Sequence, residues 1–139
     1  MELAWQDVTP LCQILGGRWV MSSAVLIVED ERQLAKNIQA YLQRSGFNVR
    51  KSENASEGLK EFKRFKPDVV LVDVMLPDLN GLQLLKRMRD LDSHAKVIMM
   101  TGAANRRIKP EAIKAGAYEF LTKPLSLKDL KILLEKALT

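Results

Sequence analysis

Short apolar runs alternate with longer amphipathic segments along most of this chain. The clearest run, residues 69–72, consists only of valine and leucine, which is the pattern of a strand buried on both faces of a parallel sheet. A carboxylate, Asp73, follows it directly, and Pro77 and the turn pair Asn80-Gly81 come a few residues later. The pattern therefore predicts an acid at the point where a buried strand ends and a loop begins.

Four further runs predict strands, and the segments between them predict helices. The second strand alternates apolar and polar residues, as an edge strand does. The strands are expected at residues 24–28, 47–50, 69–72, 96–101 and 116–122. The helices are expected at residues 34–45, 54–66, 81–89, 106–115 and 126–138. The fourth helix has little apolar face, so few buried contacts hold it and we expect it to be the mobile element.

This order of elements predicts the fold class. Five units of strand followed by helix predict an α/β fold with a doubly wound, all-parallel sheet of five strands, because right-handed crossovers place helices on both faces. Residues 23–139 form one domain in this interpretation, and no repeat or low-complexity linker interrupts it.

Residues 1–22 do not share the pattern and are interpreted as an N-terminal extension. Thr9-Pro10 provides a start signal and Gly16-Gly17 a stop signal for a short helix from Pro10 to Leu15. Fewer than two turns would be marginal alone, so a flexible segment is the alternative. A third hypothesis is that translation starts at Met21, because the Leu-Gly-Gly upstream can be encoded by a ribosome-binding-like sequence.

The composition fits a single soluble domain of 139 residues, with 47% hydrophobic and 28% charged residues. The formal charge is +5, but basic and acidic residues are mixed on the predicted helices and no helix-turn-helix is present, so direct nucleic-acid binding is not expected. No apolar run reaches the roughly 20 residues of a membrane span. A single cysteine, Cys12, and the lack of an export signal predict a cytoplasmic protein.

Five polar residues follow the ends of four predicted strands. The three acids among them could simply cap the helices that come next, but in a parallel sheet all five residues would meet at the carboxyl edge, where ligands bind. Three gathered carboxylates repel one another and raise one another's pKa unless a cation lies among them. Oxygen ligands without histidine or cysteine favour Mg²⁺ or Mn²⁺. The residues are Glu29, Asp30, Asp73, Thr101 and Lys123.

Four motifs, at residues 28–31, 67–81, 100–103 and 120–124, resemble the receiver domain of two-component response regulators. The resemblance extends from about Ser23 to the end of the chain, and the run over residues 116–124 is similar to receivers of the nitrogen-regulatory activator type. It implies a flavodoxin-like fold with strand order 2-1-3-4-5 and five helices.

The resemblance also implies roles for single residues. Asp73 would be the phosphoacceptor, and Mg²⁺ would be held by Asp30, Asp73 and the carbonyl of Met75, with Glu29 acting through water. Lys123 and Thr101 would bind the phosphoryl group, and Thr101 and Phe120 would form the switch. Gly81 and Pro124 would have structural roles, with a cis peptide bond before Pro124.

The expected function is a phosphorylation-controlled interaction module rather than an enzyme with turnover. The phosphoryl group would come from a sensor histidine kinase or a histidine-containing phosphotransfer protein, and the surface of the last two helices and the last strand would act on an output domain or a downstream protein, with a homodimer as one outcome. The alternative is a Mg²⁺-dependent phosphatase with Asp73 as nucleophile. Such phosphatases need an acid two residues after the nucleophile, where this chain has Met75.

Overall fold

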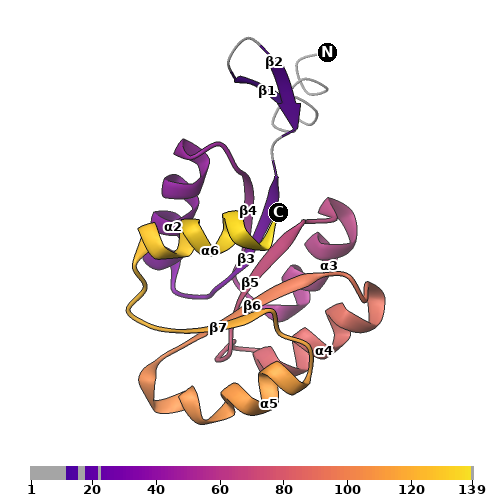
Figure 1. Cartoon of the computed structure of the whole chain (residues 1–139). Helices are drawn as coiled ribbons and strands as arrows, with labels where there is room; N and C mark the ends of the chain where they lie inside the picture. Colours follow the sequence, from indigo (N-terminus) through magenta and orange to yellow (C-terminus); the bar gives the residue numbers. More distant parts are fainter. Residues whose placement is uncertain (1–11, 16–17, 22, 139) are drawn as a thin grey trace.

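The structure is a computed structural model, and it describes residues 12–15, 18–21 and 23–138. Strands and helices alternate after an initial pair of strands (Figure 1). In chain order they are β1 (Cys12–Leu15), β2 (Arg18–Met21), β3 (Ala24–Val28), α2 (Arg32–Arg44), β4 (Asn48–Ser52), α3 (Ala55–Phe65), β5 (Val69–Asp73), α4 (Gly81–Leu91), β6 (Lys96–Thr101), the 3-10 helix η2 (Ala103–Ile108), α5 (Lys109–Lys114), β7 (Glu119–Thr122) and α6 (Leu127–Ala137).

Five of the strands form one parallel sheet in the order β4-β3-β5-β6-β7. Numbered within this sheet, the order is 2-1-3-4-5, as the resemblance implied. Helices α2 and α6 cover one face, and α3, α4 and α5 cover the other (Figure 1). The predicted doubly wound α/β fold with five α-helices is confirmed over the described residues.

The central strand β5 is buried on both faces, as its unbroken apolar run predicted. Val70 and Val72 pack in the core beneath α3 and α4, and Val69 and Leu71 pack in the core beneath α2 and α6. Each side chain of this size contributes about 1.5–3 kcal/mol when fully buried. The two cores fix β5 in the middle of the sheet, and so they fix the position of the acid at its end.

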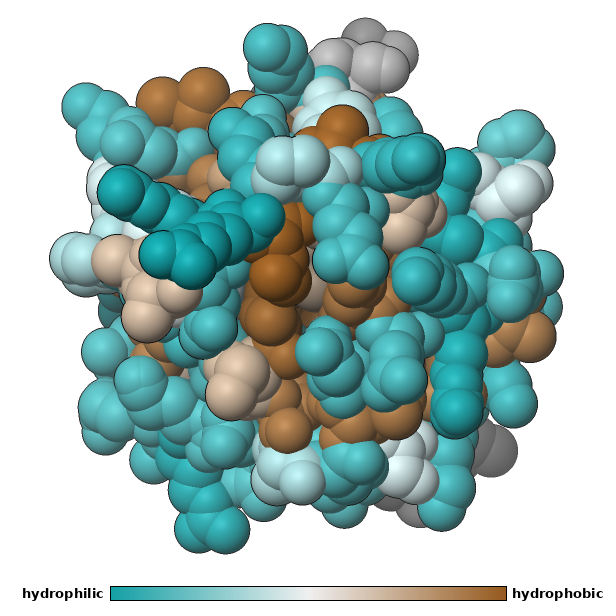
Figure 2. All heavy atoms as spheres, turned by 90° about the horizontal axis from the view of Figure 1, so that it is seen from below, coloured by the Kyte–Doolittle hydropathy of each residue, from teal (hydrophilic) through white to brown (hydrophobic). Residues whose placement is uncertain are grey.

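The face of the molecule seen from below Figure 1 is mainly hydrophilic, and a stripe of hydrophobic residues crosses its middle (Figure 2). In the part of the chain that the structure describes, no helix has both the length and the apolar character of a membrane span.

The fourth predicted helix, residues 106–115, is wrong over its first three residues. Residues 103–108 form the 3-10 helix η2, and the α-helix covers only Lys109–Lys114. Pro110 explains the change, because it lacks the N–H that would continue an α-helix through the carbonyl of Arg106. Gly116, with φ of 106°, then ends α5 in a conformation that favours glycine, which delays β7 to Glu119 instead of residue 116.

The predicted helix from Pro10 to Leu15 is wrong over the residues that the structure describes. Cys12–Leu15 is strand β1, which pairs with β2 in an antiparallel hairpin. Two short segments separated by Gly16-Gly17 are a hairpin pattern, and the sequence interpretation took the glycines as a helix stop. Pro10 and Leu11 lie outside the described residues. The hairpin is not part of the five-stranded sheet, and a translation start at Met21 stays a prediction.

Candidate functional site

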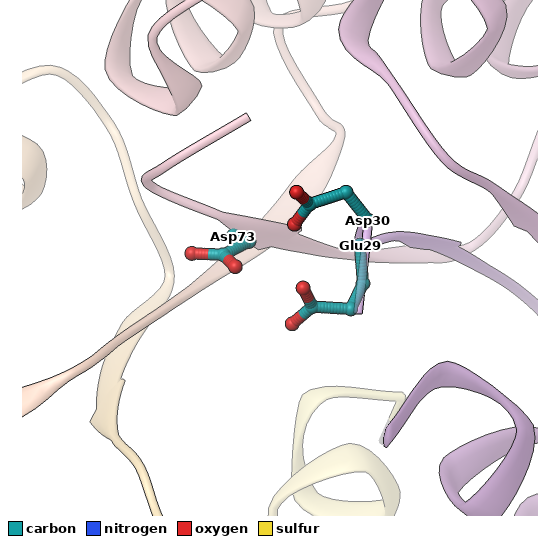
Figure 3. A group of neighbouring side chains, drawn as sticks. All are labelled: Glu29, Asp30 and Asp73. Carbon is teal, nitrogen blue, oxygen red and sulfur yellow. The ribbon is translucent and has the colours of Figure 1, made fainter. Parts of the chain in front are cut away.

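The register of the sheet brings three carboxylates together at its carboxyl edge. Val28 in β3 lies beside Val72 in β5, so Glu29 and Asp73 follow at the same level. Together with Asp30 they each offer one carboxylate oxygen, and these oxygens lie within 4.8 Å of one another (Figure 3). Glu29 and Asp73 are buried, and Asp30 is exposed. The predicted convergence of these acids is therefore present in the structure.

An ammonium group from the fifth strand of the sheet completes the cluster. Lys123 follows β7, and its Nζ donates a hydrogen bond of 2.9 Å to Asp73 Oδ2. The same Nζ lies 2.7 Å from Glu29 Oε1, as an ion pair. The backbone N–H of Lys123 donates to the carbonyl of Thr101, and the peptide bond before Pro124 is cis, as expected. One lysine thus faces two of the three acids.

Burial sets the electrostatics of the cluster. It raises the pKa of Glu29 from 4.5 to about 7, and the neighbouring Asp73 adds to the rise, while Lys123 and the N–H of Glu31 oppose it. Burial alone would lower the pKa of Lys123, but its hydrogen bonds to Glu29 and Asp73 outweigh burial and raise it. Lys123 therefore stays charged at neutral pH, whereas the carboxylate form of Glu29 is disfavoured by its surroundings.

These residues fit a divalent cation. The cluster offers oxygen atoms alone, which suits Mg²⁺ or Mn²⁺. Lys123 supplies one positive charge against three acids, so part of their negative charge is left uncompensated. A second positive ion would relieve this repulsion.

The loop after Asp73 is held by short backbone contacts. Asp73 Oδ1 accepts a hydrogen bond of 3.0 Å from the N–H of Met75, and the N–H of Gly81 donates to the carbonyl of Val74. A side chain at position 81 would place its Cβ 2.2 Å from the carbonyl oxygen of Asp73. The structural role predicted for Gly81 thus has a physical reason, which is the close approach of two backbone segments.

We expect Gly81→Ala to destabilise the domain, because the backbone of Asp73 cannot move away without disturbing β5. Overpacking of this kind costs roughly 1–3 kcal/mol. The free energy of unfolding in urea measures the effect. Gly102→Ala is the matched control, since a Cβ at Gly102 meets nothing within 4 Å. Equal losses for both variants would contradict the explanation.

Thr101 ends β6 with its side chain completely buried. Its Oγ1 has no hydrogen-bond partner among the described residues. A buried hydroxyl without a partner costs about 1–3 kcal/mol. This hydroxyl is therefore available to donate to a new acceptor. Such an acceptor would be close to Asp73, because Asp73 pairs across the sheet with Met100, the residue before Thr101.

Phe120 is buried in β7 and lies beside free space. It borders a cavity of ≈550 Å³ that is also lined by η2 and the start of α5. The structure therefore places Phe120 next to η2 and the start of α5, a segment of the fold with few buried residues. Its role as a switch stays a prediction.

Sequence reasoning missed Asp78, which lies in the loop between β5 and α4. Its two carboxylate oxygens accept hydrogen bonds of 2.8 Å and 3.0 Å from the N–H groups of Ala55 and Ser56. Asn54 accepts a hydrogen bond from the next N–H group of α3, that of Glu57. Asp78 therefore joins the loop that follows the central acid to the first turn of α3. Nothing in the sequence brings these segments together, so only the fold reveals the contact.

The link through Asp78 should depend on pH. The N–H groups of Ala55 and Ser56 hold the pKa of Asp78 below its usual value. A lowered pKa in the folded state stabilises the fold above the unfolded pKa of about 3.9, and this contribution is lost as pH falls through the folded pKa. We expect Asp78→Ala to lower the urea midpoint at pH 7, and we expect its gap from the unchanged protein to narrow in acid, as pH falls below about 3.9. Asp90→Ala removes an exposed acid from α4 and should change neither midpoint; a gap that persists in acid would argue against the charge effect.

Fold and site together define a class of protein. It is the flavodoxin-like α/β domain that carries an acidic cluster and a lysine at the carboxyl edge of its sheet. Residues 25–135 match the family model of the response regulator receiver domain. The chain belongs to this family, as the motifs had indicated.

Individual relatives agree with this assignment. The chain is 32% identical over 105 residues to the chemotaxis protein CheY of Thermotoga maritima, which covers 75% of this chain and 88% of CheY. It is 32% identical over 114 residues to the regulatory protein AtoC of Escherichia coli, which covers 82% of this chain but 25% of AtoC. A crystal structure of a receiver domain protein from Clostridium thermocellum superposes with a TM-score of 0.80 at 31% identity, over 84% of this chain and 94% of that one. The chain thus spans a quarter of AtoC and half or less of several other transcriptional regulators that it matches, but most of CheY and of the Clostridium thermocellum protein.

Proposed function

We propose that this chain is a phosphoacceptor signalling module that receives a phosphoryl group on Asp73 from a sensor histidine kinase or a histidine-containing phosphotransfer protein. The observation that carries the proposal is the hydrogen bond from Lys123 to a buried Asp73, beside two further acids. Membership of the receiver family agrees with it. The single cysteine fits a reducing compartment, and the cytoplasm stays the predicted location.

The acids would hold the metal ion that the transfer requires. Asp30, Asp73 and the carbonyl of Met75 are the proposed ligands of Mg²⁺, with Glu29 acting through water. The oxygen-only donor set and the closeness of the three carboxylates, whose oxygens lie within 4.8 Å of one another, support this assignment. Bound Mg²⁺ would neutralise negative charge on the phosphoryl oxygens.

The chain's own residues would perform the transfer. A carboxylate oxygen of Asp73 forms a bond to phosphorus while the bond between phosphorus and the donor imidazole nitrogen breaks, and the electron pair of that bond stays with nitrogen. Lys123 already points at Asp73 and would pair with a phosphoryl oxygen. The barrier is lowered mainly by positioning and charge, because phosphoryl transfer asks little else of a protein.

The phosphoryl group would then change the packing near β7. Thr101 has a free hydroxyl to donate to a phosphoryl oxygen, and Phe120 borders a cavity that it could fill differently. Segment η2 holds no buried residue and α5 only Ala112, so few contacts oppose a shift. The surface of α5, β7 and α6 is the proposed readout toward an output domain, a downstream protein or a second copy of the chain.

The test is incubation of the protein with acetyl phosphate and Mg²⁺. We expect the mass to increase by one phosphoryl group, which is lost in base as an acyl phosphate is. Many turnovers of phosphate release without a stable product would instead support the phosphatase alternative. No increase in mass and no release would refute both.

The phosphoryl group should be long-lived. Met75 and Ala103 flank the predicted acceptor, and neither side chain can orient an attacking water; the Met75 side chain is 60% exposed. We expect Met75→Asn to shorten the half-life of the phosphorylated protein by about tenfold or more. The effect should stay below the roughly 10²–10⁴-fold of full general-base catalysis, because an amide can orient a water but cannot take its proton. Loss of phosphate over time measures it. Ile132→Asn, at another exposed apolar residue, is the control, and fast hydrolysis that Met75→Asn leaves unchanged would contradict the prediction.

A further inference from the structure

Two cavities follow the line along which α3 packs beside α4. Their volumes are ≈320 Å³ and ≈370 Å³, and Lys63 lines both of them. One end of this line is formed by Asp78 and Leu79 in the loop before α4, and the other end by Pro67 and Leu91. We call this surface the α3–α4 groove. It contains neither Asp73 nor Lys123.

The floor of the groove is apolar. Leu84 and Phe62 belong to the core beneath the groove, and Leu59 and Leu79 are half-buried above it. At one end Leu91 leaves 53% of its surface exposed. The α3–α4 groove therefore offers leucine and phenylalanine side chains to a partner.

The rim of the groove is basic, and its cations are unpaired. Four exposed basic side chains line the two cavities, and none of them forms an ion pair with an acid among the described residues. By contrast Arg64, also in α3, lies 3.6 Å from Glu61. The four are Lys60, Lys63, Lys66 and Arg87.

The two acids that line the cavities are already engaged. Asp78 accepts the N–H groups of Ala55 and Ser56. Asp92 accepts the N–H of His94. Their carboxylates are therefore directed at the backbone and are not paired with the rim cations, which leaves an excess of positive charge around an apolar floor.

We propose that the α3–α4 groove is a docking site for an acidic, amphipathic helix of a protein partner. Helices α3 and α4 have 11 residues each, or about 16 Å at 1.5 Å per residue, so about three turns of a partner helix match the groove. Its apolar face meets Leu59, Leu79 and Leu91, and its carboxylates reach the rim cations. Nucleic acid would satisfy the cations but leave the apolar floor uncovered, which is why we assign a peptide.

The test uses a synthetic, fluorescein-labelled peptide of three to four turns, with leucines three and four positions apart and glutamates beside them. Fluorescence anisotropy gives the affinity, and amide chemical shifts of the ¹⁵N-labelled protein locate the contact. We expect binding, with shifts concentrated in α3 and α4. The double variant Lys63→Glu/Arg87→Glu should weaken binding on the order of tenfold or more. Lys128→Glu, which changes an exposed charge on α6, should not alter it.

Three outcomes would overturn the proposal. The first is equal binding of a peptide in which every glutamate is replaced by lysine. The second is a set of chemical-shift changes that lies away from the residues of the α3–α4 groove. The third is tighter binding of duplex DNA or of phosphatidylglycerol vesicles that the double variant abolishes, which would assign the groove to nucleic acid or to a membrane surface.

Two further measurements keep the proposal testable on its own. If circular dichroism shows that the double variant does not fold, two other measurements take its place. The affinity for the peptide should fall in the variant Leu91→Ser, and the affinity of the unchanged protein should fall as the salt concentration rises. Asp73→Asn should bind the peptide as the unchanged protein does, since the groove lacks that residue. Failure of docking and failure of phosphorylation are therefore separate results.

Discussion

Asp73→Asn should abolish phosphorylation of this chain by acetyl phosphate. The amide nitrogen and oxygen of asparagine are too weakly nucleophilic to form a stable acyl phosphate, so the acceptor is lost and not merely slowed. The intact mass after incubation with Mg²⁺ and acetyl phosphate measures the effect. We expect the unchanged protein to gain one phosphoryl group and Asp73→Asn to gain none within detection.

The variant should remain folded, because one of three crowded carboxylates is removed. Its amide oxygen can still accept one of the two hydrogen bonds that Asp73 accepts, which come from the N–H of Met75 to Oδ1 and from Lys123 to Oδ2. Asp92→Asn is the matched control, since it neutralises an exposed acid after α4 and should be phosphorylated at the normal rate. A phosphoryl group of equal yield on Asp73→Asn would place the acceptor elsewhere and reject the proposed function.

Lys123→Gln should slow phosphorylation by roughly 10²–10³, the usual cost of removing one charged or hydrogen-bonding group aimed at the developing charge. The ammonium group is held 2.9 Å from Asp73 and 2.7 Å from Glu29, and its raised pKa keeps it charged throughout neutral pH. Glutamine can donate a hydrogen bond but supplies no charge. The observed rate of phosphorylation at fixed acetyl phosphate is the measurement.

Lys128→Gln is the control for charge, because that lysine is exposed at the start of α6. The far-ultraviolet circular dichroism of both variants reports whether they fold. A rate within a factor of about three of the unchanged protein would mean that Lys123 pairs with Asp73 for structural reasons alone.

The sequence was sufficient for the sheet because its three inner strands, β3, β5 and β6, are buried on both faces over nearly all their length. Unbroken apolar runs such as Val69–Val72 leave little choice of structure once they alternate with amphipathic segments. The site followed from the same pattern, since parallel strands bring their carboxyl ends to one edge. Asp30, Asp73 and Lys123 could be grouped without coordinates for that reason.

Other features depend on contacts that the order of residues does not contain. The hairpin of β1 and β2 has strands of four residues, which are too short for periodicity to separate strand from helix. Asp78 finds its partners in α3 through the fold, more than twenty positions away. The effect of Pro110 on η2 was local, by contrast, and could have been derived from the missing N–H group.

In the proposed function, the buried hydroxyl of Thr101 affects how far phosphorylation shifts the populations of the two states of the domain. The unphosphorylated state already carries one unsatisfied donor, so phosphorylation would recover about 1–3 kcal/mol when that donor finds an acceptor. A difference of this size shifts a two-state population by roughly 5- to 150-fold. In the proposed function, one hydroxyl would therefore separate the populations of the unphosphorylated and phosphorylated states by as much as about two orders of magnitude.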